Sequence, residues 1–207
     1  MSNQEQNIVL KDNTVFIKSY ENSSKILKHN SILRELIGSC SNTSCPIKCN
    51  TWARCIPNGK LNTEIMFADA YPNAFDVYGG CFTGITGEIL HQGLSNINRD
   101  NIYCTTILKC NNIQDVNQNV IKCCLSFYFL KELENIKPKK LILTNAAYLA
   151  CVKYNVLHSV DNITLFTKNI VNIIGLDYEL ELYVVLDFDE SNEQNQKNLI
   201  QGLQFIS

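Results

Sequence analysis

The sequence feature that most constrains the fold is a short apolar run followed by an acid and a glycine-rich loop, within residues 64–90. Ile65–Ala68 is apolar and bounded by polar residues, which predicts a buried strand of a parallel sheet. Asp69 follows where this strand ends, at the carboxyl edge where open α/β sheets bind ligands. Dense glycines at 79–87 surround Phe82 and permit close approach of the backbone to a ligand. Asp69 and Phe82 are therefore candidate site residues, although an acid can also cap a turn and a Phe is often core.

The rest of the chain alternates apolar runs of strand length with segments of helical spacing. We expect strands at 101–108, 140–144 and 180–186, mixed strand and loop at 162–174, and helices at 23–38, 89–94, 120–137, 145–152 and 192–205. This alternation predicts an α/β fold, a three-layer α/β/α sandwich with a central, largely parallel sheet. A chain of 207 residues favours one domain, at residues 21–207, after an N-terminal arm or edge strand at residues 1–20.

Composition restricts the class of partner. The net charge of −2 gives no global basic field, so nucleic acid would need a local patch, for which Lys109 and the group Lys137, Lys139 and Lys140 are the candidates. No apolar run approaches the roughly 20 residues that span a bilayer, and the N-terminus lacks the order of a signal peptide. We therefore expect a cytoplasmic protein with no membrane partner. Abundant Asn, Ile and Lys are typical of an AT-rich genome, such as that of a low-GC bacterium or its phage.

Cysteines supply a second chemical signal. The chain has ten, and four of them, Cys40, Cys45, Cys49 and Cys55, lie within sixteen residues. In a reducing compartment they are expected to be thiols or metal ligands and not disulfides. Four thiolates hold an iron–sulfur cluster, and thiolates also bind zinc tetrahedrally. The alternative is a scatter of buried thiols.

The stretch at 64–90 resembles the first motif of the iron–sulfur (family 4-like) uracil-DNA glycosylases, G-E-A-P-G-x-x-x-D-x-x-G-x-P-F-x-G-x-x-G-x-L-L. In an alignment without gaps, residues 68–70 align with G-E-A, Asp76 aligns with the Asp of the motif, and Phe82 aligns with its Phe. Ala68 and Asp69 replace the family's Gly and Glu. The resemblance implies one catalytic residue, Asp69, and four substrate-binding residues, Ala70, Asp76, Phe82 and Thr106.

Two further stretches resemble the family's cluster motifs. The segment 101–110 matches Y-x-T-N-x-x-K-C, with Cys110 on the third cluster cysteine and Thr106 in place of the Asn. Cys45, followed by Pro and Ile, keeps the family distance to Asp69. The resemblance implies a 4Fe–4S cluster, with zinc as the lesser alternative, held by Cys40, Cys45, Cys110 and Cys124. Cys49 competes with Cys40, and Cys123 with Cys124.

The resemblance implies a DNA glycosylase that hydrolyses the N-glycosidic bond of uracil or a related base in single- or double-stranded DNA. Asp69 would position water and stabilise the sugar cation, and Phe82 would stack on the flipped base. The family's His after the last strand is missing, since residues 183–191 are acidic and lack His, and Thr106 offers fewer hydrogen bonds than an amide. These departures favour the alternative, an inactive member that binds nucleic acid or a protein partner. An altered base specificity is a third interpretation.

Overall fold

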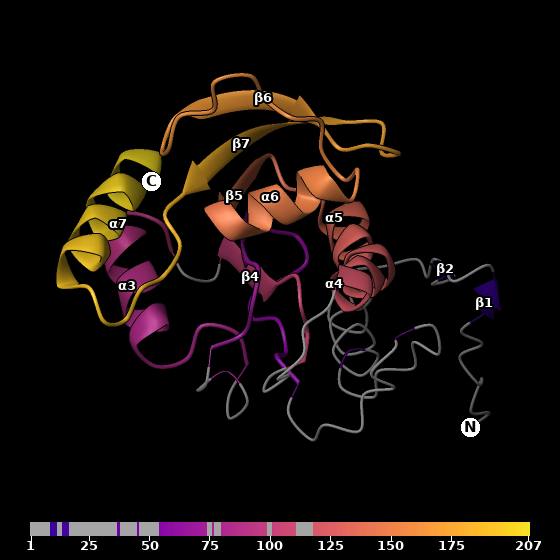
Figure 1. The fold of residues 1–207 in the computed structure, drawn as a ribbon, viewed down its shortest axis with the longest axis horizontal. Helices are drawn as coiled ribbons and strands as arrows, with labels where there is room; N and C mark the ends of the chain where they lie inside the picture. The colour runs from indigo at the N-terminus through magenta and orange to yellow at the C-terminus, as the bar shows by residue number, and fades with distance from the viewer. Residues whose placement is uncertain are drawn as a thin grey trace.

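A five-stranded mixed sheet forms the centre of the molecule (Figure 1). The computed structural model describes residues 9–11, 14–16, 37, 45, 54–73, 76, 80–98, 101–110 and 118–207. The strands are β3 (Ile65–Asp69), β4 (Ile102–Thr106), β5 (Lys140–Thr144), β6 (Lys168–Asn172) and β7 (Glu179–Val185), in the spatial order β4-β3-β5-β7-β6. Four strands are parallel, and β6 joins β7 in antiparallel orientation. The short strands β1 (Val9–Lys11) and β2 (Thr14–Phe16) pair with each other in a separate two-stranded sheet within the predicted arm.

Helices cover both faces of the sheet. One face carries α3 (Ile85–Gly93) and α7 (Glu193–Ile206), and the other carries α6 (Asn145–Lys153) and the continuous run α4 (Gln118–Cys124), η2 (Leu125–Phe129) and α5 (Leu130–Ile136) (Figure 1). Successive strand residues point to opposite faces. Accordingly Phe67 packs in the cluster with Leu90 and Leu203, whereas Met66 packs in the cluster with Leu133 and Tyr148. The predicted α/β class is confirmed, and the arrangement is compatible with a three-layer sandwich.

Most predicted elements match the structure, with three differences. Helix α3 begins at Ile85, four residues before the predicted start. The helix predicted at 120–137 contains a π-helical turn, η2, in its middle. The mixed region 162–174 contains β6, in which only Val171 is buried, so its periodicity is weak. The helix predicted at 23–38 lies outside the described residues except for Ile37.

Local sequence explains where several helices begin and end. The Thr144 hydroxyl accepts a hydrogen bond from Ala147 N and begins α6, and the Asn192 side chain accepts one from Asn195 N and begins α7. Helix α5 ends at Ile136, and the next residue, Lys137, adopts a left-handed conformation with φ 48° directly before a proline. In the described part of the chain, no helix has the length and apolar character required to cross a bilayer.

The strand order creates a topological switch point. Strand β3 is followed by α3 and then by β4 on one side, whereas the chain after β5 continues to β6 and β7 on the other side. The neighbouring strands β3 and β5 thus send their connections in opposite directions. In open α/β sheets, the crevice at the carboxyl ends of two such strands is the usual ligand site. The last residues of these two strands are Asp69 and Thr144.

Candidate functional site

Asp69 lies at this switch point, partly buried. Its Oδ1 accepts hydrogen bonds from Ala70 N at 2.6 Å and from the Thr144 hydroxyl at 2.7 Å. Its Oδ2 accepts no hydrogen bond from any residue in the described ranges. Burial raises the pKa of Asp69 to about 6, and the charges of Asp187 and Asp76 add to the rise, whereas the two hydrogen bonds oppose it. The carboxyl is therefore ionised at neutral pH and basic enough to accept a proton from water.

Ala70 and Asp76, predicted to bind substrate, are both buried and engaged within the protein. The Ala70 carbonyl accepts from Leu108 N at 3.0 Å. Asp76 accepts from Asn73 N at 3.0 Å through Oδ2 and from Thr83 N at 3.1 Å through Oδ1. Burial raises the pKa of Asp76. These bonds connect Asn73 to Thr83 in the glycine-rich loop, so Asp76 shapes the loop.

Phe82 occupies a left-handed backbone position, with φ 59°. Its ring lies 5.1 Å from that of Phe67 and 5.7 Å from that of Phe188, measured between centroids. Gly87 permits this arrangement, because a Cβ there would lie 2.0 Å from the Phe82 carbonyl oxygen. Only 4% of Phe82 is exposed, so the residue is chiefly part of the core.

A pocket of about 340 Å³ adjoins Phe82. Its walls come from the segment at Asn58 and Gly59, the glycine-rich loop, helix α3 and strand β4. The lining is Asn58, Gly59, Cys81, Phe82, Thr83, Gly87, Leu90, His91, Leu94, Ile102 and Cys104. The volume lies at the lower end of the range for small-molecule sites. Asp69 does not line it, so the pocket lies beside Phe82 and not at the carboxylate. Neither Asn58 nor Gly59 was among the predicted site residues.

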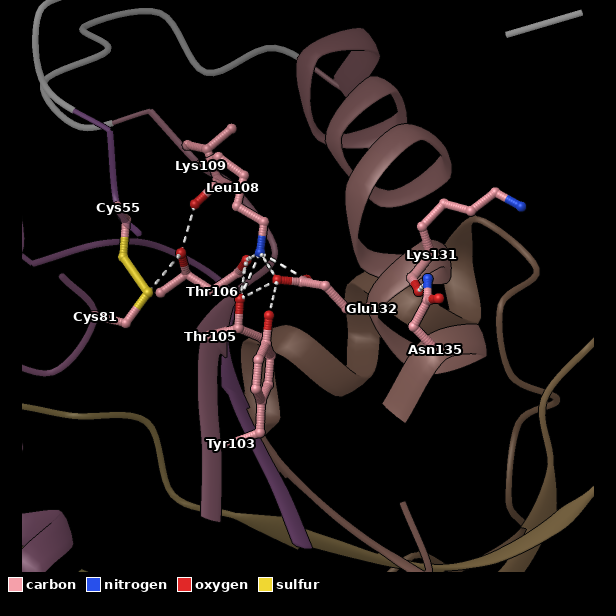
Figure 2. A network of polar contacts seen from close by, with 10 residues as sticks. All are labelled: Cys55, Cys81, Tyr103, Thr105, Thr106, Leu108, Lys109, Lys131, Glu132 and Asn135. Carbon is pink, nitrogen blue, oxygen red and sulfur yellow. Dashed lines mark hydrogen bonds and ion pairs between the residues drawn. A yellow bond between two sulfur atoms is a disulfide. The ribbon is translucent and has the colours of Figure 1, made fainter. Parts of the chain in front are cut away.

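Thr106, predicted to read the base edge, is fully buried at the end of β4 (Figure 2). Its hydroxyl donates to the Leu108 carbonyl at 2.7 Å, and its carbonyl accepts from Lys109 Nζ at 2.6 Å. In this conformation the hydroxyl is committed to the turn after β4.

Lys109, one of the local basic candidates, belongs to a buried polar network and does not contribute to a basic surface. Its Nζ lies 2.7 Å from Glu132 Oε2 and 2.9 Å from Oε1, and neither side chain is accessible to more than 1% (Figure 2). The Tyr103 and Thr105 hydroxyls donate to the same Glu132 at 3.0 and 2.8 Å. Burial lowers the pKa of Lys109, and the charge of Glu132 opposes that change. A charge so enclosed cannot reach a phosphate.

The other basic candidates lie at the opposite edge of the sheet from Asp69. Lys137, Lys139 and Lys140 occur at the amino end of β5. Lys139 pairs with Glu64, and Lys140 Nζ donates to the Ile206 carbonyl at 2.7 Å. These lysines therefore do not form a basic patch around the candidate site.

Three of the four predicted cluster ligands are described. Cys45, Cys110 and Cys124 are buried, and Cys45 packs with Cys124 in one small cluster. Cys123 packs against the same cluster. Its burial raises the pKa of its thiol, and the charge of Cys45 adds to this rise. Among the described residues, no three His, Cys, Asp or Glu side chains form a group suited to a metal ion. Cys40 and its competitor Cys49 lie outside the described residues.

The prediction that the cysteines are not disulfide-bonded is wrong for one pair. Cys55 and Cys81 form a disulfide, with their Cα atoms 5.3 Å apart (Figure 2). It joins the segment before Asn58 to the glycine-rich loop. The two residues are 26 positions apart, and the spacing alone gave no reason to pair them.

Sequence reasoning missed two residues that follow β7, where the glycosylases carry their His. Asp187 Oδ1 accepts from Ala146 N at 2.8 Å, at the start of α6. The Phe188 ring lies 6.0 Å from that of Phe67. An acidic segment is usually a solvated face. Its position directly after a parallel strand was the available signal, because such positions meet at the same edge as Asp69.

No protein-family model matches the chain, and no curated protein matches it either. The resemblance to the glycosylases therefore rests on the spaced motifs alone.

Proposed function

We propose that the protein is a divergent DNA glycosylase that hydrolyses the N-glycosidic bond of uracil or a related base in DNA. The observation that carries the proposal is the state of Asp69. It lies at the switch point of the sheet, its Oδ1 is fixed by two hydrogen bonds, and its Oδ2 accepts none from a described residue. A pKa of about 6 keeps this carboxylate ionised at neutral pH.

The chemistry assigned to Asp69 follows from the charges that develop during the reaction. Breaking the bond between base and sugar leaves positive charge on the sugar, which a fixed carboxylate stabilises. The same carboxylate orients water and takes its proton. Thr144 and Ala70 hold Oδ1, so Oδ2 is the oxygen assigned to the water.

The glycine-rich loop and the pocket beside Phe82 support the binding part of the proposal. A glycosylase needs a recess for an extruded base. The pocket of about 340 Å³ presents Phe82 together with the polar side chains of Asn58 and Thr83. Phe67 stands two residues before Asp69 on β3 and contacts Phe82, which connects the pocket to the carboxylate.

The test is base release from uracil-containing oligonucleotides, both single- and double-stranded, read as cleavage at abasic sites after alkali. The wild type is expected to produce abasic sites, and Asp69→Asn to reduce the rate by about 100-fold or more, the range for loss of a general base. Asp177→Asn is the matched control, since Asp177 is an exposed acid in the turn before β7. Absence of product from the wild type, or an unchanged rate in Asp69→Asn, would falsify the proposal.

A non-catalytic binding module is the second candidate. Two observations favour it: the Thr106 hydroxyl is committed to the Leu108 carbonyl, and Asp187 stands in the region of the family's His. An anionic side chain there would repel both a base anion and a DNA phosphate. Fluorescence anisotropy on the same oligonucleotides separates the candidates, because a module would bind without releasing base, or would bind a protein partner instead.

A 4Fe–4S cluster belongs to the proposal as a structural group. Thiolates hold such clusters in sets of four. The buried thiols of Cys45, Cys110 and Cys124 have the right chemistry, yet within the described ranges they do not converge as three ligands. The described residues therefore do not complete the site, and no reaction step is assigned to the cluster. Zinc is the alternative group for the same thiols.

A further inference from the structure

We infer that Asp187 is a positioning residue for Asp69, acting through the first turn of α6 and through its own negative charge. The inference rests on the proposed function for its catalytic meaning. The contacts of Asp69 and Asp187 with the first turn of α6 are observed in the structure and do not depend on the proposed function.

The first turn of α6 holds both carboxylates. The Thr144 hydroxyl donates its proton to Asp69 Oδ1 at 2.7 Å and accepts from Ala147 N at 3.4 Å. Ala146 N, the amide just before, donates to Asp187 Oδ1 at 2.8 Å. Both acids therefore bind the same helix turn, whose partial positive charge favours them both. Because one rigid turn connects them, displacement of Asp187 is transmitted to the hydroxyl that holds Asp69.

Phe188 fixes the chain next to Asp187. Its ring packs against Phe67, at 6.0 Å, and against Phe82, at 5.7 Å. Phe67 and Asp69 are on the same face of β3, because they are two residues apart. Asp187 is exposed. Its position is defined by the hydrogen bond from Ala146 N and by the packing of the next residue, Phe188.

The charges around Asp69 are negative. Burial is the largest cause of the raised pKa of Asp69. The negative charges of Asp187 and Asp76 raise this pKa further. On the helices that cover this face, Glu88 in the first turn of α3 and Glu193 in the first turn of α7 are exposed acids. Thr144 acts in the opposite direction, because its hydroxyl donates to the ionised carboxylate.

These opposing contributions predict opposite effects of two substitutions. Asp187→Asn keeps an oxygen that accepts from Ala146 N and removes only the charge, so it should lower the pKa of Asp69. Thr144→Val removes the donated hydrogen bond and should raise it. A residue with a merely structural role would not move this pKa when its hydrogen bond is preserved.

The experiment is a pH titration of the Asp69 carboxyl by ¹³C NMR in the full chain with labelled aspartate, the signal being assigned with Asp69→Asn. We expect a midpoint near 6 in the wild type, a decrease of about half a unit or more in Asp187→Asn, and an increase in Thr144→Val. Asp177→Asn should leave the midpoint unchanged. An Asp69 midpoint that is the same in Asp187→Asn and the wild type overturns the inference.

The titration needs no substrate, so its outcome is independent of base release. If the wild type releases no base but the Asp69 midpoint moves as expected, the proposed function fails and the coupling between Asp187 and Asp69 holds. If base is released, the acid limb of its pH–rate profile should move to lower pH in Asp187→Asn. A profile that does not move overturns the positioning role in catalysis.

Discussion

At the residue scale, Asp69 shows how a candidate catalytic group can oppose the stability of its own fold. Burial disfavours its charge, and Asp187 and Asp76 add repulsion. The ordinary pKa of 3.8 rises to about 6 on folding. At pH values between these two, the folded state binds more protons than the unfolded state, so stability falls as pH rises through this range. Above about pH 6 the full loss of stability caused by Asp69 is present, and below about pH 4 Asp69 causes no loss of stability.

We therefore predict that Asp69→Asn stabilises the protein at pH 7.5 and not at pH 3.5. Asn keeps an oxygen for Ala70 N and Thr144 but carries no charge. A rise of about two pKa units corresponds to about 3 kcal/mol as an upper value for the gain in unfolding free energy. Urea denaturation of both proteins at the two pH values measures it. An equal difference at both pH values would exclude ionisation as the cause.

The sequence predicted the place of Asp69 but not its partners. An acid directly after a buried strand lies at the carboxyl edge whatever the order of the strands. Thr144 and Asp187 come close to it only because β5 lies beside β3 and β7 lies beside β5. Lys109 was misjudged for a similar reason. A lysine is normally exposed, and the partner that allows its burial, Glu132, is 23 residues away on another element.

At the scale of elements, the Lys109–Glu132 pair joins the turn after β4 to helix α5. Tyr103 and Thr105 donate to the same carboxylate, so one acidic side chain on α5 gathers three groups from β4 and its turn. A buried charge is costly when its partner is removed, because water cannot replace that partner.

We predict that Lys109→Met lowers the unfolding free energy by about 3–5 kcal/mol, the range for breaking a buried pair. The neighbouring pair Lys131–Glu134 on the same helix is the control, because it is partly exposed, and Lys131→Met should cost less than about 1 kcal/mol. The double variant Lys109→Met with Glu132→Gln should be less destabilised than Lys109→Met, because no unpaired charge is left. Chemical denaturation measures all three, and equal losses for Lys109→Met and Lys131→Met would contradict the assignment.

The elements that the sequence predicted well have strong apolar patterns, and those it missed depend on contacts. Strands β3 and β5 have buried central residues on both faces and read as apolar runs. The start of α3 was missed because Gly87 looked like part of a loop. That glycine is needed inside the helix because the Phe82 carbonyl passes close to it. Strand β6 shows one buried side chain, too few to define a period.

At the scale of the whole molecule, alternation along the chain was sufficient to predict an α/β fold. It was not sufficient to predict the order of the strands, which is determined by contacts between distant segments. The cysteines show the same limit. Their pattern indicated a shared site, whereas the structure pairs Cys55 with Cys81 and groups Cys45 with Cys124.

We predict that protein purified without oxygen contains about four irons and four sulfides per chain and absorbs broadly at roughly 400 nm. Cys110→Ser and Cys124→Ser should each reduce the iron content. Cys151→Ser is the control, since Cys151 is a buried thiol on α6 in the main core. A colourless protein without iron would refute the cluster, and one zinc per chain would support the alternative.

The order of the strands also has a consequence for synthesis on the ribosome. The first strand of the large sheet to emerge, β3, occupies its interior, and β4, β5 and β7 each add beside a strand that is already made. Only β6 must wait, because its sole neighbour, β7, follows it. A nascent chain that has emerged as far as Thr144 already contains both partners of the hydrogen bond between Thr144 and Asp69. Asp187 arrives later, so the second carboxylate joins a site whose first half can form before translation ends.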